Sequence, residues 1–222
     1  AVSGDGADEL FGSYRSHRMA FPAAAGGEPD WQWRARLLVL SEAEKQRLYA
    51  PHVREALAGT STAWHLQQAF QDLTSRDALN RVLEAEFNGI FPDQVLTFVD
   101  RLSMAHALEV RCPFLDTDVV EFVAPIPGTL KIHDGETKYL LKKAALRYFP
   151  EEMVRRPKEG FLMPITPWVL GHLQPWVRET LSPERLRMHG LFDAAEVGRL
   201  VNRLREPGAD YTDVNQIGRA HV

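Results

Sequence analysis

Apolar residues recur at helical spacing along most of the chain. In its first half the pattern predicts helices over residues 31–39, 41–49, 64–73, 77–87 and 93–110. Ser41 followed by Glu44 forms a capping box, which favours a helix start at that point. The stretch 93–110 carries few charges, so we expect that helix to be buried. Residues 22–29 are rich in alanine, glycine and proline and are predicted to form a connection.

Further helices are predicted in the second half. Asp116 is placed to cap a helix over residues 116–123, and the prolines and glycine of residues 125–128 end it. Residues 130–132 fit a short extended piece. The remaining helices are expected over residues 137–149 and 168–181, with two short helices within 183–205.

The chain begins with a pattern typical of a strand that enters a turn. Ala1 and Val2 are apolar, and the turn of residues 3–6 leads into a predicted helix whose first turn holds Asp8 and Glu9. Because a lone strand end needs a sheet and no comparable strand follows soon after, we expect most of a sheet to lie upstream of residue 1.

The composition is that of a globular protein that needs no cross-link to fold. Its 222 residues are 45% hydrophobic and 25% charged. A single cysteine, Cys112, excludes an intrachain disulfide and a cysteine-ligated zinc ribbon, so a cytoplasmic location fits best. The formal net charge of -4 argues against a nucleic-acid partner. No apolar run reaches the roughly 20 residues of a membrane span, so we expect no membrane partner either.

The turn of residues 3–6, which we call the glycine turn, is the first candidate site. Two glycines after a strand end let backbone N–H groups approach an anion closely, as phosphate-binding turns do. The neighbouring carboxylates of Asp5, Asp8 and Glu9 would repel a phosphate unless a divalent cation lay between them, which points to Mg²⁺ and a nucleotide. The alternative is an acidic helix start after an ordinary glycine turn.

Two further segments combine charge with an unusual setting. The loop 155–161 places Lys158 among arginine, proline and glycine, where a cation can stabilise charge on a phosphoryl group, although such loops are often solvated surface. Charges within residues 100–111 are embedded in an apolar stretch. We expect Asp100 with Arg101, and Glu109 with Arg111, to form internal ion pairs or ties between helix and loop rather than a catalytic site.

Taken together, these segments resemble the synthetase domain of glutamine-hydrolysing asparagine synthetases. The motifs that carry the resemblance are, in chain order, SGDGADELFG at 3–12, DRLSMA at 100–105, EVRCPFLD at 109–116, TKYLL at 137–141, and RPKEGF at 156–161 with Pro164. The resemblance implies an α/β domain of the ATP-pyrophosphatase type, similar to the adenine nucleotide alpha hydrolases. Residues 1–216 would be its mainly helical C-terminal part. Residues 217–222 are identical to a translated short-read sequencing adapter, and we expect them to be an artefact.

The resemblance also implies a reaction and its partners. In this family the side-chain carboxylate of aspartate attacks the α-phosphate of ATP, giving β-aspartyl-AMP and pyrophosphate, and ammonia derived from glutamine then displaces AMP to give asparagine. The expected cofactors are ATP and Mg²⁺. A glutaminase domain is expected upstream in the same chain, and a homodimer is one assembly left open.

Site residues follow by matching the family's motifs. Asp8 matches a metal-binding aspartate, Lys158 matches a catalytic lysine that contacts the nucleotide phosphates, and Asp5 stands at a catalytic position where the family usually has glutamate. The turn residues Ser3, Gly4 and Gly6 are the expected nucleotide-binding backbone.

This chain also departs from the family pattern. Asp5 is one methylene shorter than glutamate, so its carboxylate reaches roughly 1.5 Å less far, enough to alter a proton transfer. The family's Ser-Gly-Gly-x-Asp-Ser pyrophosphate loop is absent from residues 1–222, so we expect this chain alone to be inactive. Two alternatives stay open: a related amidotransferase or β-lactam-synthetase-like enzyme that adenylates another carboxylate, and a non-catalytic helical interaction module.

Overall fold

A computed structural model describes residues 1–14, 17–18, 31–32, 40–156, 164–204 and 206. The chain divides into two compact units, each with its own core. We call Ala1–Leu37 with Ala63–Lys158 the first unit, and Leu38–Thr62 with Glu159–Val222 the second unit. Within the described residues the regular elements are helices, joined by isolated β-bridges. No helix in these ranges combines the length and the apolar character that a membrane crossing requires.

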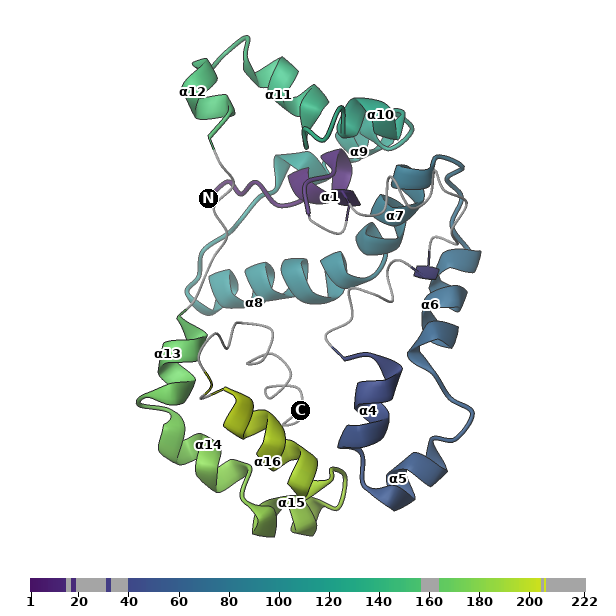
Figure 1. The fold of residues 1–222 in the computed structure, drawn as a ribbon. Helices are drawn as coiled ribbons and strands as arrows, with labels where there is room; N and C mark the ends of the chain where they lie inside the picture. The colour runs from purple at the N-terminus through teal and green to yellow at the C-terminus, as the bar shows by residue number, and fades with distance from the viewer. Residues whose placement is uncertain (15–16, 19–30, 33–39, 157–163, 205, 207–222) are drawn as a thin grey trace. The chain divides into compact units, whose positions relative to one another are not determined.

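The first unit is built from short helices (Figure 1). Among the described residues they pack around two small apolar clusters. In chain order its elements are α1 (Ala7–Phe11), α6 (Thr62–Gln71, which begins at the unit boundary), α7 (Ala78–Phe87), the π-helix η1 (Phe91–Leu96), α8 (Thr97–Ala105), the 3₁₀ turn η2 (Pro113–Leu115), α9 (Thr117–Val123), α10 (Gly128–Lys131), α11 (Tyr139–Ala145) and α12 (Glu151–Val154).

Helix α1 lies at the centre of the first unit and contacts α7, α9 and α11. Leu10 and Phe11 of α1 pack with Val123 of α9 in one cluster. Leu79 and Leu83 of α7 pack with Ile132 in the other. These side chains are almost fully buried, so the short α1 is fixed from several sides despite its five residues.

The extended start predicted for the chain is present. Val2 forms a parallel bridge with Arg111, in which the Ser3 amide donates to the Arg111 carbonyl at 2.8 Å and the Arg111 amide donates to the Ala1 carbonyl at 3.0 Å. This bridge aligns the glycine turn with the segment that follows α8. The placement of a sheet upstream of residue 1 stays a prediction.

The prediction of a buried helix over residues 93–110 is wrong in two respects. The stretch divides into η1 and α8, and α8 ends at Ala105. Phe98, Leu102 and Met104 are at least half exposed, at 65%, 51% and 52%. Burial depends on which element packs against a helix, and the spacing of apolar residues along α8 does not specify that partner.

The predicted internal ion pairs lie on the surface. The Arg111 Nε lies 3.1 Å from the Glu109 Oε1, but both side chains are mostly exposed. Asp100 and Arg101 are exposed as well. Exposed pairs contribute little to stability because water screens them, so the prediction that these charges are internal is wrong.

Other predicted elements shift in type or length. Of the predicted extended piece 130–132 only Ile132 is extended, because Gly128–Lys131 forms the helical turn α10 against α7. A Cβ on Gly128 would lie 2.7 Å from the Leu79 Cβ, so glycine is what lets this turn approach α7. The helix predicted over 137–149 is shorter, at Tyr139–Ala145.

The described helices of the second unit pack around an apolar core and are joined by hydrogen bonds and ion pairs. Its elements are α4 (Glu42–Leu48), α5 (Pro51–Ala56), α13 (Ile165–Leu170), α14 (Gln174–Thr180), α15 (Pro183–His189) and α16 (Ala194–Arg203). The core consists of Leu48, Leu186, Val197, Leu200 and Leu204. The two short helices predicted within 183–205 are confirmed, whereas the helix predicted over 168–181 is interrupted at Gly171.

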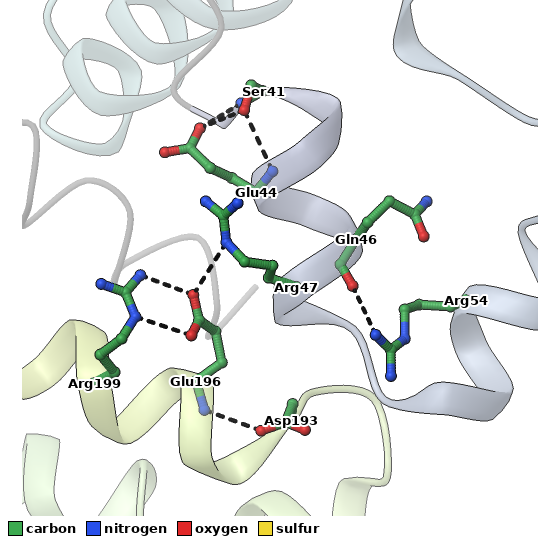
Figure 2. Close-up of polar contacts among 8 residues, drawn as sticks. All are labelled: Ser41, Glu44, Gln46, Arg47, Arg54, Asp193, Glu196 and Arg199. Atoms are coloured by element: carbon green, nitrogen blue, oxygen red, sulfur yellow. Dashed lines mark hydrogen bonds and ion pairs between the residues drawn. The ribbon is translucent and has the colours of Figure 1, made fainter.

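Figure 2 shows how α4 begins and how it meets α16. The Ser41 amide donates to Glu44 at 2.7 Å and the Glu44 amide donates to the Ser41 hydroxyl at 3.3 Å, which confirms the predicted capping box. Glu196 of α16 accepts from Arg199 at 2.8 and 2.9 Å and lies 3.7 Å from the Arg47 Nε of α4. The predicted connection 22–29 and most of the predicted helix 31–39 lie outside the described residues.

Candidate functional site

The glycine turn ends at Gly6, whose backbone sets the entry into α1. Gly6 has φ +92° and is the residue immediately before the helix. A Cβ at this position would lie 2.5 Å from the Leu115 Cδ2, so a larger residue would both strain the backbone and strike η2. The Gly6 carbonyl then accepts from the Leu10 amide at 3.0 Å, which begins the helical hydrogen bonding.

The remaining turn residues present an open surface. Gly4 is exposed, and no other atom lies within 4 Å of where its Cβ would be. The Ser3 hydroxyl donates to the Asp5 Oδ2 at 2.5 Å, which holds the Asp5 carboxylate over the turn. Burial and the nearby Asp5 charge raise the pKa of the Cys112 thiol.

Asp8, the predicted metal ligand, lies beside a lysine from a distant part of the chain. The Lys138 Nζ is 2.9 Å from the Asp8 Oδ1, and each side chain is about a quarter exposed, at 25% and 24%. Lys138 has φ +53°, which is uncommon for a residue with a Cβ, and its amide donates to the Gly12 carbonyl at 3.1 Å. Backbone strain of this kind persists only where the surrounding structure holds the residue in place, and here the ion pair and the bond to Gly12 do so.

Glu9, the third acidic residue of this segment, lies in α1 and is buried. Glu9 is buried and accepts a hydrogen bond from the Tyr14 hydroxyl at 2.7 Å. Burial raises the pKa of Glu9, and burial together with Glu9 raises the pKa of Tyr14. Below them the fully buried His17 accepts at Nδ1 from the Ser13 and Tyr14 amides, at 3.1 and 3.3 Å. Its Nε2 therefore carries the proton and donates to Glu86 at 2.7 Å.

The carboxylates in and just after the glycine turn therefore have different environments. Asp5 accepts from Ser3, Asp8 pairs with Lys138, and Glu9 is buried. Among the described residues no three His, Cys, Asp or Glu side chains converge as a metal site would require. A cation at this turn would be held by one carboxylate and by phosphate oxygens, which is a common mode for Mg²⁺, and the partly exposed Asp8 fits that mode.

The loop 155–161, the second candidate segment, lies only partly within the described residues. Lys158 lies outside the described residues, as do residues 217–222. Arg155, at the start of the same loop, donates to Glu151 at 2.7 Å and to Glu136 at 3.2 Å. These ion pairs favour a structural role for Arg155.

Neither Lys138 nor the buried cluster of Glu9, Tyr14, His17 and Glu86 was predicted from the sequence. Lys138 belongs to the TKYLL motif, which carried the resemblance without suggesting a role for the lysine. A basic residue just before a helix and an acidic one in another helix give no pairing signal in a single sequence. Their contact spans 130 positions, which only the fold can bring together.

Comparison with known proteins identifies the family. The family model for asparagine synthase matches residues 1–217. The chain belongs to the asparagine synthase family. It is 29% identical over 214 residues to asparagine synthetase [glutamine-hydrolyzing] 1 of Bacillus subtilis, covering 82% of this chain and 33% of the relative. This match confirms the resemblance seen in the motifs.

Two further relatives are less similar to this chain, and one of them is named an amidase. A putative asparagine synthetase [glutamine-hydrolyzing] of Mycobacterium tuberculosis H37Rv is 27% identical over 240 residues, covering 95% of this chain and 36% of the relative. Amidase chry2 of Gibberella zeae is 23% identical over 248 residues, covering 86% and 36%. The chain thus spans about a third of the length of these relatives. No solved structure matches it significantly.

Proposed function

We propose that this chain is part of an ATP-dependent amide-forming ligase that makes asparagine. In the proposed reaction the side-chain carboxylate of aspartate is adenylated, giving β-aspartyl-AMP and pyrophosphate, and ammonia from glutamine displaces AMP. The observation that carries the proposal is the glycine turn, which presents an open backbone at Gly4 next to a partly exposed carboxylate at Asp8. Membership of the asparagine synthase family supports the choice of reaction.

The turn residues would bind and orient the nucleotide. Ser3, Gly4 and Gly6 line a backbone that a phosphate can approach without meeting a side chain at Gly4. Asp8 would hold Mg²⁺, which when bound neutralises phosphate charge and polarises the phosphoryl group. Lys138 holds the Asp8 carboxylate by an ion pair of 2.9 Å. The glutaminase domain and the cytoplasmic location belong to this proposal as well.

Asp5 and Lys158 would act on the reacting groups. Lys158 is expected to neutralise charge that develops on the phosphates during adenylation. Asp5, with its carboxylate held by the Ser3 hydroxyl, is expected to handle a proton as ammonia attacks. The shorter side chain at this position moves the carboxylate back toward the turn.

A related carboxylate is the second candidate substrate. The match to a protein named an amidase covers most of this chain, and Asp5 departs from the glutamate usual in asparagine synthetases. An enzyme that adenylates a different acid would keep Asp8 and Lys158 and change only the acid it accepts. A non-catalytic helical module would have no need for a carboxylate next to an open glycine turn.

Pyrophosphate release by the full-length protein tests the proposal. With ATP, Mg²⁺, aspartate, and glutamine or ammonia, we expect release that depends on aspartate and falls at least 100-fold in Lys158→Ala and Asp8→Asn. Lys143→Ala, which removes an exposed lysine of α11, is the matched control and should keep full activity. Release with another acid but not with aspartate would favour the second candidate. No release with any acid would contradict a ligase.

A further inference from the structure

Helix α1, which carries Asp8, depends on the turn that follows it. The helix has only five residues, and the residue before it, Gly6, has no side chain that could cap it. At the other end of the helix the Gly12 amide donates to the Asp8 carbonyl at 2.9 Å. The position of Gly12 therefore helps to set the position of the Asp8 backbone.

The same glycine also holds the partner of Asp8. The Gly12 carbonyl accepts from the Lys138 amide at 3.1 Å, and the Lys138 Nζ lies 2.9 Å from the Asp8 Oδ1. Gly12 thus binds the backbone of one member of the ion pair with its N–H group and the backbone of the other member with its carbonyl. A shift of the turn of residues 12–14 would move both members of the pair.

His17 fixes this turn from inside the protein. The amides of Ser13 and Tyr14, the two residues after Gly12, donate to the His17 Nδ1 at 3.1 and 3.3 Å. The His17 side chain is fully buried, and its Nε2 donates to the Glu86 carboxylate of α7 at 2.7 Å. A buried amide that loses its acceptor costs free energy, so this imidazole stabilises the turn in the position described.

A second hydrogen bond leads from the turn to α1. The Tyr14 hydroxyl donates to the Glu9 Oε1 at 2.7 Å, and Glu9 is the neighbour of Asp8 in the helix. The turn is thus attached to α1 through Gly12 and Tyr14, and to α7 through His17. A displacement of the turn relative to α7 would be transmitted to Asp8 along both attachments.

We propose that His17 is a positioning residue of the candidate site. Its imidazole accepts from two amides of the turn and in this way holds the pair of Asp8 and Lys138 where Asp8 can bind Mg²⁺ together with the nucleotide. The inference rests on the proposed function, which assigns Asp8 to Mg²⁺. The alternative is a histidine that only fills space in the core. The two roles differ in whether the acceptor Nδ1 matters for nucleotide binding.

Two substitutions separate the roles of the two ring nitrogens. Asparagine carries its amide oxygen as many bonds from the backbone as Nδ1, so His17→Asn can accept from the turn amides but does not reach Glu86. Glutamine carries its amide one bond farther out, at the position of Nε2, so His17→Gln can donate to Glu86 but leaves the turn amides unpaired. His17→Ala removes both contacts. His65→Ala, on the exposed surface of α6, is the matched control.

Binding of Mn²⁺–ATP to the full-length protein tests the proposal, with Mn²⁺ in place of Mg²⁺ so that electron paramagnetic resonance can measure it. We expect His17→Ala and His17→Gln to bind Mn²⁺–ATP about tenfold more weakly, because a small displacement of a positioning group is enough for such a loss. His17→Asn and His65→Ala should bind as the unmodified protein does. Equal losses in His17→Asn and His17→Gln would show that His17 only fills space, and unchanged binding in His17→Ala would also overturn the proposal.

The tautomer of His17 gives a second measurement that does not depend on a variant. Nitrogen NMR of the full-length protein labelled at histidine should show His17 with an unprotonated Nδ1 and a protonated Nε2, in the absence of nucleotide. A proton on Nδ1 in the folded protein would contradict the proposal, because that nitrogen could not then accept from the turn.

The positioning role and the proposed ligase activity can fail separately. Mn²⁺–ATP binding needs neither aspartate nor glutamine. A protein that releases no pyrophosphate with any acid, but binds Mn²⁺–ATP more weakly in His17→Gln than in His17→Asn, would refute the ligase alone. An active ligase whose KM for Mg²⁺–ATP is unchanged in His17→Ala and His17→Gln would refute the positioning role alone. Absence of Mn²⁺–ATP binding by the unmodified protein would overturn both.

Discussion

At the scale of single residues, the pairing of Asp8 with Lys138 decides the electrostatics of the candidate site. The ammonium lies where it neutralises the carboxylate that the proposed function assigns to Mg²⁺. Any cation that binds Asp8 must then compete with Lys138 or displace it. The lysine therefore lowers the affinity of the turn for a free cation and keeps Asp8 in place until a nucleotide brings its own negative charge.

We expect Lys138→Ala to strengthen binding of Mn²⁺, used as a probe for Mg²⁺, several-fold in the absence of nucleotide. The loss of one partly exposed ion pair should cost less than about 1 kcal/mol of stability. Electron paramagnetic resonance measures free Mn²⁺ directly. Lys142→Ala, in the next turn of the same helix, is the matched control. Weaker Mn²⁺ binding in Lys138→Ala would show that the lysine supports the cation rather than competing with it.

Lys131 gives the stability of the protein a defined pH dependence. Burial lowers its pKa to about 8 from the ordinary value of 10.5. Between these values the unfolded chain binds a proton that the folded protein has released, so raising the pH favours the folded state. Below about pH 8 the cost of the buried charge is fully present.

Lys131→Met should therefore be more stable than the unmodified protein at neutral pH. Its advantage should shrink by as much as about 3 kcal/mol as the pH rises from about 8 to 10.5. Urea unfolding of both proteins across this pH range measures the difference in their free energies of unfolding. The titration of other groups is common to both proteins and cancels in that difference. A constant difference would mean that Lys131 is not buried as a cation.

At the scale of elements, the helix starts were the most predictable features. The capping box at Ser41 and the cap at Asp116 are both present, because each depends on hydrogen bonds between residues two or three positions apart. Burial of α8 and the helical turn α10 were predicted wrongly. Both depend on packing against segments far away in the sequence, as at Gly128, which lies against Leu79.

Asp77 makes both a local and a long-range contact. It caps α7 by accepting from the Asn80 amide, and it also accepts from the Gly128 amide. We expect Asp77→Ala to lower the free energy of unfolding by about 2 kcal/mol, because a cap and a second partly buried amide lose their acceptor. Asp116→Ala removes a cap alone, on the surface, and should cost about 1 kcal/mol. Chemical denaturation compares them. Equal losses would mean that the bond to Gly128 adds nothing.

At the scale of the whole molecule, the two units have apolar cores built from different residues. Leu79 belongs to the first unit and Leu200 to the core of the second unit. Both side chains are almost fully buried, at 0% and 5% exposure. Each unit thus has its own source of stability.

Leu79→Ala and Leu200→Ala should each cost about 2–5 kcal/mol, because each leaves a cavity in a packed core. Hydrogen exchange followed by mass spectrometry should show protection lost first in the unit that carries the substitution. Simultaneous loss in both units after either substitution would mean that the two cores unfold as one.

The sequence by itself determined the family, through its motifs, and the local structure that short-range hydrogen bonds define. The glycine turn, the starts of α4, α7 and α9 and the separation of α15 from α16 all follow from residues that are neighbours along the chain. Tertiary structure decided which charges meet and which are buried. The contact of Asp8 with Lys138 and the burial of Glu9 and Lys131 depend on how distant helices pack, and a sequence pattern records only which residues are apolar, not which surfaces they will face.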